Sequence, residues 1–409
     1  MEEWKEYKLG DLYDVHNGLS KGGKFFGSGY PFLSFKTVFN NYFLPAILPD
    51  LVQSNEKEQK GYDIKRGDVF VTRTSETPEE LGMSSVALKD YPSATYNGFT
   101  KRLRPKNTSL VYPEFIGYYL RSSKFRALFY GLASSMSTRA SLANGDLLGM
   151  RVFLPSYDTQ ERIANILHSL DDKIEVNRRI NDNLEQQAMA LFKSWFVDFE
   201  PFRDQPFVES ELGRIPEGWN AGSLEDITTQ KSERVGGRED MKVLSPVTTG
   251  QLMLSEEYFT KQVFSESIAK YKVVEKGDFA YNPARVNIGS LGRNNYDFDG
   301  CVSPVYVVFS CKDGYAYLFD LYRKTEKFKT EVYLRAIGGV RQSLNYKDFA
   351  FIQCIIPPLY IVEEFNAIYD HLLVMQKHTG EENGRLASLR DTLLPRLMSG
   401  ELRVGDVTL

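Results

Sequence analysis

The chain has 409 residues, of which 42% are apolar and 25% charged, and this composition excludes disorder and collagen-like structure. It is too long for one hydrophobic core and predicts two or three domains. Its odd set of three cysteines (Cys301, Cys311 and Cys354) lacks a CxxC spacing, so we expect reduced thiols and no metal. No charged leader opens the chain and no apolar stretch is long enough for a bilayer. We therefore expect a cytoplasmic protein with no membrane partner.

Charge alternates along the chain. Residues 1–155 carry a net +4 and residues 211–357 a net of 0, whereas residues 156–210 and 358–409 carry −5 and −3. The two acidic blocks are unsuited to lying against phosphate and favour contacts with protein.

In chain order, the first block predicts an α+β domain. Short alternating stretches such as residues 68–72 are bounded by glycine turns and predict strands, and a helical piece follows around residues 114–130. The block at 219–358 has the same character, with strand-like residues 304–309. We place the boundaries as follows: a first α+β domain at 1–156, a central helix at 157–200, a linker at 201–218, a second α+β domain at 219–358 and a distal helix at 359–409.

The chain repeats itself. Trp4 recurs as Trp219, Gly67-Asp68 as Gly277-Asp278, and Arg139 as Arg341. The offset falls from 215 to 202 and is then constant to the end of each half. The sequence therefore predicts a tandem duplication in which each copy has a divergent front block and a maintained helix.

The maintained module has a seven-residue apolar repeat. The predicted seam residues are Ile163, Leu170, Asn177, Leu184 and Leu191 in the first helix and Phe365, Leu372, Thr379, Leu386 and Leu393 in the second. This spacing predicts two helices of roughly 40 residues, about 60 Å long at 1.5 Å per residue, that form a coiled coil. Asp158 and Thr159 are expected to cap the first helix. If the helices are antiparallel, Asn177 lies near Thr379 and fixes the register; the alternative is a merely solvated layer.

Catalytic motifs are absent. Neither GxGxxG nor GxxxxGK[ST] occurs, and none of the four histidines stands in a metal-ligand spacing. The Asn282-Pro283-Ala284-Arg285 stretch lacks the second proline and the aromatic residue of an amino-methyltransferase loop. We expect that the chain is not an enzyme.

Four stretches give the chain a resemblance to a known family, the specificity (S, HsdS) subunits of type I restriction–modification systems. They are WKEYKLGDL at 4–12, ALFKSWFVDFEPF at 190–202, ELGRIPEGW at 211–219 and LLPRLMSGELRV at 393–404. The segment from Leu154 to Ile163 also matches, but Val362 stands in the second copy where the first has Gln160. The resemblance covers essentially the whole chain.

This resemblance implies two α/β target recognition domains separated by an antiparallel coiled coil. Each domain would read one half of a bipartite target in double-stranded DNA, and the helices would set the gap and dock two modification (M) subunits and the restriction (R) subunits. S-adenosylmethionine, ATP and Mg would belong to those partners, and this chain would hold no cofactor. A spacer of about 60 Å limits the separation to roughly 17 base pairs at 3.4 Å per pair. The alternative is a duplicated coiled-coil adaptor that binds only proteins.

Candidate DNA-binding residues are basic, amide or hydroxyl side chains near predicted strand ends. They are Arg73, Asn97, Lys101, Arg102, Arg104, Arg139 and Ser141 in the first copy and Arg285, Asn287, Ser290, Arg293, Arg341 and Ser343 in the second. Arginine and asparagine suit guanine and adenine edges, whereas lysine and serine more often hold phosphate. Arg139 and Arg341 are kept in both copies although the targets should differ, which favours phosphate contact. Any of these side chains could alternatively belong to a solvated face.

Trp195, with Phe196 and Phe199, forms an aromatic stripe at the end of the first helix. Such a stripe is usually core; the alternative is an anchor for the M subunit.

Overall fold

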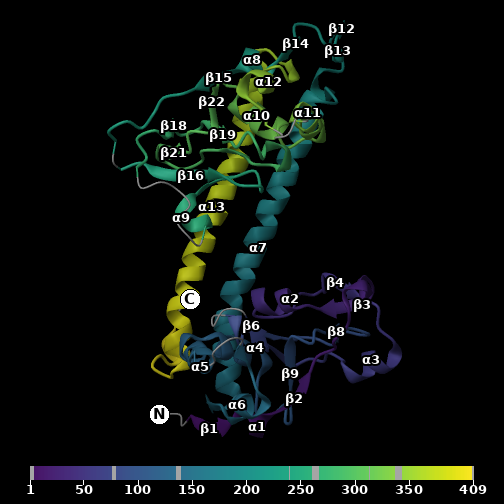
Figure 1. Cartoon of the computed structure of the whole chain (residues 1–409), viewed down its shortest axis with the longest axis vertical. Helices are drawn as coiled ribbons and strands as arrows, with labels where there is room; N and C mark the ends of the chain where they lie inside the picture. Colours follow the sequence, from purple (N-terminus) through teal and green to yellow (C-terminus); the bar gives the residue numbers. More distant parts are fainter. Residues whose placement is uncertain are drawn as a thin grey trace. The chain divides into compact units, whose positions relative to one another are not determined.

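The computed structural model describes residues 4–75, 80–134, 140–238, 240–259, 267–312, 314–336 and 343–407 (Figure 1). The chain forms two compact units. Unit 1 comprises Met1–Arg178 and Gly380–Leu409, and unit 2 comprises Arg179–Thr379. Two long helices, α7 (Tyr157–Phe196) and α13 (Leu359–Met398), each contribute one part to unit 1 and the other part to unit 2.

The front part of unit 1, which we call the first module, contains two small sheets and two strand pairs. The four-stranded antiparallel sheet has the order β2 (Tyr13–Asn17), β9 (Thr100–Pro105), β5 (Val69–Thr72), β7 (Ser84–Val86). The three-stranded sheet has the order β4 (Asp50–Val52), β3 (Phe26–Leu33), β8 (Thr95–Tyr96). The pairs are β1 (Lys5–Lys8) with β11 (Arg151–Leu154) and β6 (Thr74–Ser75) with β10 (Ala140–Ser141). Its helices are α1 (Leu9–Leu12), α2 (Phe35–Asn40), α3 (Glu56–Gly61), α4 (Pro113–Arg121), α5 (Ser123–Ser134) and α6 (Asn144–Gly149).

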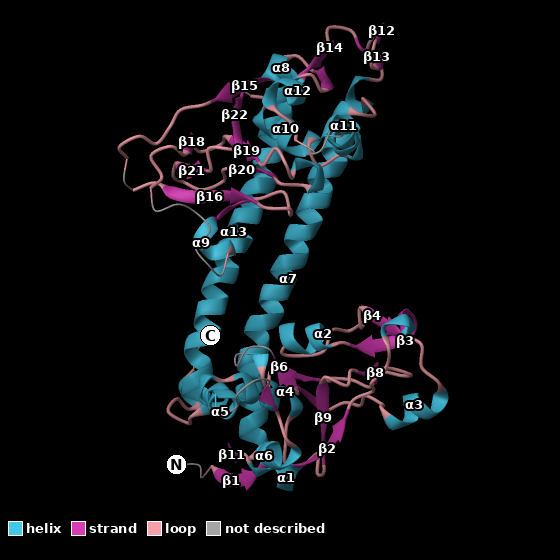
Figure 2. Cartoon of the chain, in the orientation of Figure 1, coloured by secondary structure: helices cyan, strands magenta, loops and turns pink. Residues whose placement is uncertain are grey.

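The front part of unit 2, the second module, also contains two small sheets and two strand pairs (Figure 2). Its antiparallel sheet has the order β15 (Thr228–Lys231), β22 (Val307–Cys311), β19 (Phe279–Tyr281), β20 (Leu291–Arg293). The second sheet has the order β17 (Leu252–Leu254), β16 (Lys242–Pro246), β21 (Gly300–Val302), β18 (Lys272–Val274). The pairs are β14 (Asn220–Ser223) with β23 (Gln353–Ile356) and β12 (Phe207–Ser210) with β13 (Gly213–Pro216). Its helices are α8 (Leu224–Ile227), α9 (Ser255–Tyr258), α10 (Ala316–Tyr322), α11 (Glu326–Ala336) and α12 (Tyr346–Ala350).

The long helices are antiparallel in each unit. In unit 1 the beginning of α7, with Leu167 and Leu170, packs in one core cluster with Leu393 and Leu397 near the end of α13. In unit 2 the end of α7, with Phe192 and Phe196, packs in one cluster with the beginning of α13. The predicted α/β modules and antiparallel coiled coil are therefore confirmed, and α13 continues through Gly380 and Gly384.

The predicted seam residues lie on the packed faces of the two helices. Ile163, Leu170, Asn177, Leu184, Phe365 and Leu393 are buried, and Leu191, Leu372, Thr379 and Leu386 are half-buried. The first helix begins at Tyr157, and the side chain that caps it is Ser156, whose Oγ accepts the N–H of Thr159 at 3.3 Å. The predicted caps, Asp158 and Thr159, lie two and three residues further along the chain.

The polar layer at the middle of the helices differs from the prediction in its pairing. Asn177 Nδ2 donates to Glu382 Oε2 at 2.7 Å and to Asn383 Oδ1 at 3.0 Å. Thr379 Oγ1 donates to Asn181 Oδ1 at 2.5 Å. Each of these two seam residues thus bonds to a residue of the other helix that the heptad count does not mark. Asn177 is nevertheless fully buried, which contradicts the alternative of a solvated layer at this residue.

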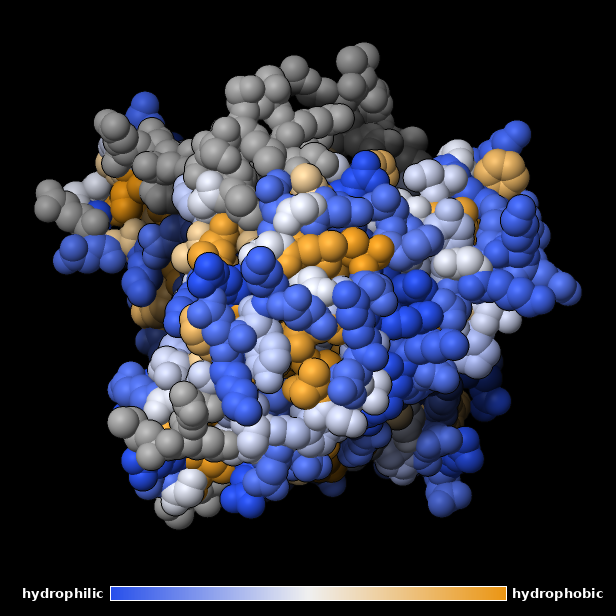
Figure 3. All heavy atoms as spheres, turned by 90° about the horizontal axis from the view of Figure 1, so that it is seen from below, coloured by the Kyte–Doolittle hydropathy of each residue, from blue (hydrophilic) through white to orange (hydrophobic). Residues whose placement is uncertain are grey.

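Among the described residues, no helix combines the length and apolarity that a membrane crossing requires. The face drawn in Figure 3 is mostly hydrophilic, with hydrophobic residues in a few small patches. The apolar residues of both modules are instead gathered in core clusters beneath their sheets and helices.

Candidate nucleic-acid interface

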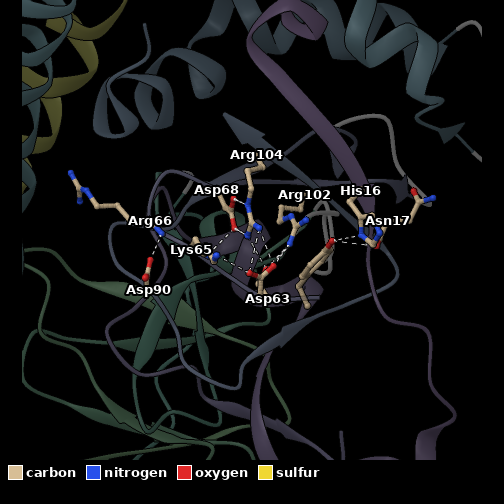
Figure 4. Close-up of polar contacts among 10 residues, drawn as sticks. His16, Asn17, Asp63, Lys65, Arg66, Asp68, Asp90, Arg102 and Arg104 are labelled. Atoms are coloured by element: carbon tan, nitrogen blue, oxygen red, sulfur yellow. Dashed lines mark hydrogen bonds and ion pairs between the residues drawn. The ribbon is translucent and has the colours of Figure 1, made fainter. Parts of the chain in front are cut away.

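Arg102 and Arg104, on strand β9, are held inside the first module by two aspartates (Figure 4). Arg104 donates to both carboxylate oxygens of Asp68, at 2.7 and 2.6 Å, and to Asp63 at 3.0 Å. Arg102 Nη1 donates to the side chain and the backbone carbonyl of Asp63, both at 2.7 Å. Asp68 is fully buried and also accepts the backbone N–H of Lys65 at 2.8 Å. These two arginines therefore stabilise the module by tying strand β9 to the segment that carries Asp63 and Asp68, just before β5.

The charges of this cluster support one another. Burial raises the pKa of Asp63, but the charges of Arg104, Arg102 and Lys65 and a hydrogen bond from Arg104 lower it by more. The hydrogen bond to Asp68 raises the pKa of Arg104, and the nearby carboxylate charges add to this, against the effect of burial. The guanidinium of Arg102 also lies over the ring of Tyr96, 5.5 Å from its centroid. Arg104 thus remains charged, and both arginines are bonded within the module.

The second module keeps the buried aspartate but supplies another cation. Asp278 is 4% exposed and accepts the backbone N–H of Glu275 at 3.0 Å, as Asp68 accepts that of Lys65. Its cation is Lys231 from strand β15, at 2.9 Å. Burial raises the pKa of Asp278 although Lys231 acts in the opposite direction. Both aspartates follow a glycine with positive φ, Gly67 at 87° and Gly277 at 89°, in the turn before the central strand.

A different group of residues meets where the central strand of the first module ends. Arg73 follows β5; its N–H donates to Phe99 O at 2.8 Å and its carbonyl accepts from Leu142 N at 2.8 Å. The turn at residues 97–100 joins β8 to β9 and includes Asn97, which is half-buried. Lys101 starts β9 beyond this turn, is 4% exposed and donates to Asn144 Oδ1. We call Arg73, residues 97–100 and residues 140–142 the strand-end rim of the first module.

The second module has the same rim. Residues 282–285 follow the central strand β19, and Pro283 O accepts from Leu344 N at 3.0 Å, as Arg73 O accepts from Leu142 N. The turn at residues 303–306 joins β21 to β22. Burial raises the pKa of Tyr306, while the charge of Arg285 and a hydrogen bond with Asn282 lower it, so this turn and residues 282–285 are neighbours. Arg285 and Ser343 are exposed there.

The remaining predicted residues of the second module differ in availability. Ser290 is buried and donates to Pro246 O at 2.5 Å. Arg293 lies over the ring of Tyr317, 4.8 Å from its centroid, and donates to Gly277 O at 3.3 Å. Arg293 and the half-buried Asn287 line a pocket of about 740 Å³ in unit 2.

The structure therefore sorts the predicted residues into four groups. Arg73, Asn97, Arg285 and Ser343 lie at the rims, and Lys101, Arg102, Arg104 and Ser290 are bonded inside their modules. Asn287 and Arg293 line the pocket of unit 2. Arg139 and Arg341 lie outside the described residues, and for Ser141 the structure gives only its place in β10. The sequence analysis did not predict that Asp68 and Asp278 are buried partners of a cation, although it identified the repeated Gly-Asp pair that contains them.

Trp195 belongs to the interior of unit 2. Its ring is half-buried and contacts Phe365 and Phe202, with ring centroids 5.8 Å apart in both cases. These contacts favour the core interpretation. Within the described ranges, His, Cys, Asp and Glu form no group of three or more that could hold a metal ion.

Comparisons with known proteins agree with this architecture. Residues 1–186 match the family model of the type I restriction modification DNA specificity domain. The chain is 26% identical to the MjaIX specificity subunit of a type I restriction enzyme from Methanocaldococcus jannaschii, over 99% of this chain and 95% of that protein. It is also 26% identical to the HindI specificity subunit of a type I restriction enzyme from Haemophilus influenzae, over 98% of this chain and the whole of that protein. The crystal structure of a type I S subunit from M. genitalium aligns with a TM-score of 0.56 and 13% identity, over 97% of this chain and 96% of that one.

Two α/β modules, each carrying the same strand-end rim and joined through antiparallel helices, define a duplicated two-domain protein. Over almost its whole length the chain is similar to the specificity subunits of type I restriction enzymes, and its first 186 residues match the model of their DNA specificity domain.

Proposed function

We propose that this chain selects the DNA sequence on which a type I restriction–modification complex acts, with each module reading one half of a bipartite target. The observation that carries this proposal is the repeated rim. The same strand ends meet in both modules, but they present Arg73 and Asn97 in one and Arg285 in the other. A common scaffold with different donors at its edge suits the reading of two different half-sites.

The proposal includes the partners. The long helices would hold the half-sites at a fixed separation and dock two M subunits and the R subunits, and the complex would act in the cytoplasm. The acidic charge of the two helix blocks, −5 over residues 156–210 and −3 over residues 358–409, supports a protein partner there. Specificity subunits are non-catalytic. Adenine methylation with S-adenosylmethionine and cleavage with ATP and Mg would belong to the partners.

Phosphate contacts complete the proposal. Arg139, Ser141, Arg341 and Ser343 precede the segments that join each rim, and both copies keep them. They would hold the DNA backbone, so Arg139→Ala should weaken binding evenly across sequences and reduce the salt slope by about one.

The test is a module exchange. Genome methylation is mapped in cells that produce the M subunit with this chain, and then with a version whose residues 219–358 come from another specificity subunit. We expect a split motif with a fixed gap that changes on one side only. Methylation that does not depend on the chain would refute the proposal and favour an adaptor that binds only proteins, for which a shallow salt dependence of DNA binding is the second sign.

A further inference from the structure

Each module exposes a large apolar side chain at the tip of its rim turn. Phe99, between β8 and β9, is 61% exposed, and Val305, between β21 and β22, is 71% exposed. Single exposed apolar residues are common on protein surfaces and by themselves indicate nothing. These two differ because they occupy the same turn of the duplicated fold.

The strand pairing establishes the equivalence of the turns. In the first module β8 pairs in parallel with β3, and β9 lies between β2 and β5. In the second module β21 pairs in parallel with β16, and β22 lies between β15 and β19. The turns at 97–100 and 303–306 therefore join equivalent strands: β8 corresponds to β21, and β9 corresponds to β22.

The first turn is held rigidly. Phe99 N–H donates to Asn97 Oδ1 at 2.6 Å, and Thr100 N and Oγ1 both donate to Asn97 O, at 3.0 and 2.7 Å. Gly98 N–H donates to Leu19 O at 2.8 Å, and a Cβ on Gly98 would lie 2.4 Å from Ser20 Oγ. Phe99 O accepts the N–H of Arg73 at 2.8 Å. The ring is thus presented to solvent on a fixed backbone, next to a cation.

The second turn is also fixed. Pro304 restricts the backbone before Val305, and Tyr306 N–H donates to Ser303 O at 3.0 Å. Lys272 Nζ donates to Tyr306 O at 2.6 Å. Arg285 lies close enough to affect the pKa of Tyr306. In both modules an apolar tip therefore stands beside an arginine on a preorganised turn.

From this geometry we propose that the two tips contact base pairs directly. Phe99 wedges its ring into a base step of the first half-site and partly unstacks it, and Val305 packs against a thymine methyl group of the second. Apolar side chains such as phenylalanine can insert between the base pairs of a duplex in this way, and small apolar side chains recognise the thymine methyl in the major groove. The neighbouring Arg73 and Arg285 donate to base edges beside these two contacts, as the proposed function requires. This inference rests on the proposed function and assigns the residues that carry part of the readout.

The experiment uses the complete complex with its M subunits and a duplex that contains the mapped target. For Phe99, 2-aminopurine replaces an adenine of the first half-site. We expect its fluorescence to rise on binding of the wild-type complex but not with Phe99→Ala, and specific binding to weaken about tenfold. Phe99→Leu should retain part of the affinity and lose the fluorescence change. The matched control is Ile47→Ala: Ile47 is an apolar residue of the same module that is 85% exposed and is not one of the rim residues, so this variant should have no effect.

For Val305, uracil replaces each thymine of the second half-site in turn. At one position the loss of a methyl group should weaken wild-type binding about fourfold, and Val305→Ser should be insensitive to the same change. The inference would be overturned if Phe99→Ala bound DNA with the affinity and the fluorescence change of the wild type, or if no uracil substitution weakened wild-type binding. Either result would leave the split methylation motif, and with it the proposed function, unaffected. If the wild-type complex itself showed no split motif, both this inference and the proposed function would fall.

Discussion

Replacing Arg104 by methionine should destabilise the first module, because this side chain pairs with a buried carboxylate inside the module. Arg104 makes a bidentate pair with Asp68, which is fully buried, and its own side chain is 29% exposed. Removing one partner of such a pair leaves a buried charge unpaired and costs roughly 3–5 kcal/mol. A change of 1 kcal/mol shifts the melting temperature of a domain of this size by about 2–4 °C, so we expect the melting temperature of Arg104→Met to fall by about 10 °C.

The assay is thermal unfolding of the isolated chain, with hydrogen exchange at β5 and β9 to locate the change. The matched control is Lys65→Met, which removes a cation from the same cluster: Lys65 is 59% exposed and 3.5 Å from Asp63. An exposed pair contributes less than about 1 kcal/mol, so this variant should melt within a few degrees of the wild type. An Arg104→Met chain of wild-type stability but reduced DNA affinity would refute the reasoning and restore Arg104 to the DNA interface.

Three further predictions concern buried polar groups. The hydrogen bond from Asn177 is the main reason that the pKa of Glu382 is lowered, so Asn177→Leu should raise that pKa in an NMR titration; an unchanged pKa would contradict the observed polar layer. Gln160 is 1% exposed and satisfies three backbone groups, so Gln160→Val should cost about 2–3 kcal/mol in chemical denaturation, and no loss would show that water replaces the amide. Burial raises the pKa of Asp278, so its folded form holds a proton in a pH range where the unfolded form has lost it, and stability falls as pH rises through the folded pKa. Lys231→Met should widen that range, and denaturation should show a larger loss of stability at pH 8 than at pH 5; equal losses would mean that Lys231 does not compensate this carboxylate.

The duplication and the long helices could be predicted from the sequence because their signals are periodic. A seven-residue spacing reports which face of a helix is buried whatever its partner is, and Leu170 and Phe365 are buried as the spacing predicts. The partner of a polar seam residue is not encoded in that spacing. It depends on the stagger between the helices, which is why Asn177 bonds to Glu382.

The interface could be predicted only in part. A basic residue near a strand end looks the same in the sequence whether it faces solvent or a buried carboxylate. Arg104 is 41 residues from Asp63 and 36 from Asp68, and strand pairing alone brings these side chains together. Phe99 was overlooked because an apolar residue between two strands is usually read as part of a strand, whereas here it stands on the turn.

The buried aspartate limits how the two halves of this gene can recombine. The first module neutralises it from β9 with Arg104 and the second from β15 with Lys231. By strand register, the second module has Ser310 at the position of Arg104, and the first has His16 at the position of Lys231. A crossover between these two strands would give two products. One would have both an arginine and a lysine beside the single buried carboxylate, and the other would have only a histidine there. Crossovers within the maintained helices would exchange whole modules with their charge pairs intact, so new specificities should arise by that route.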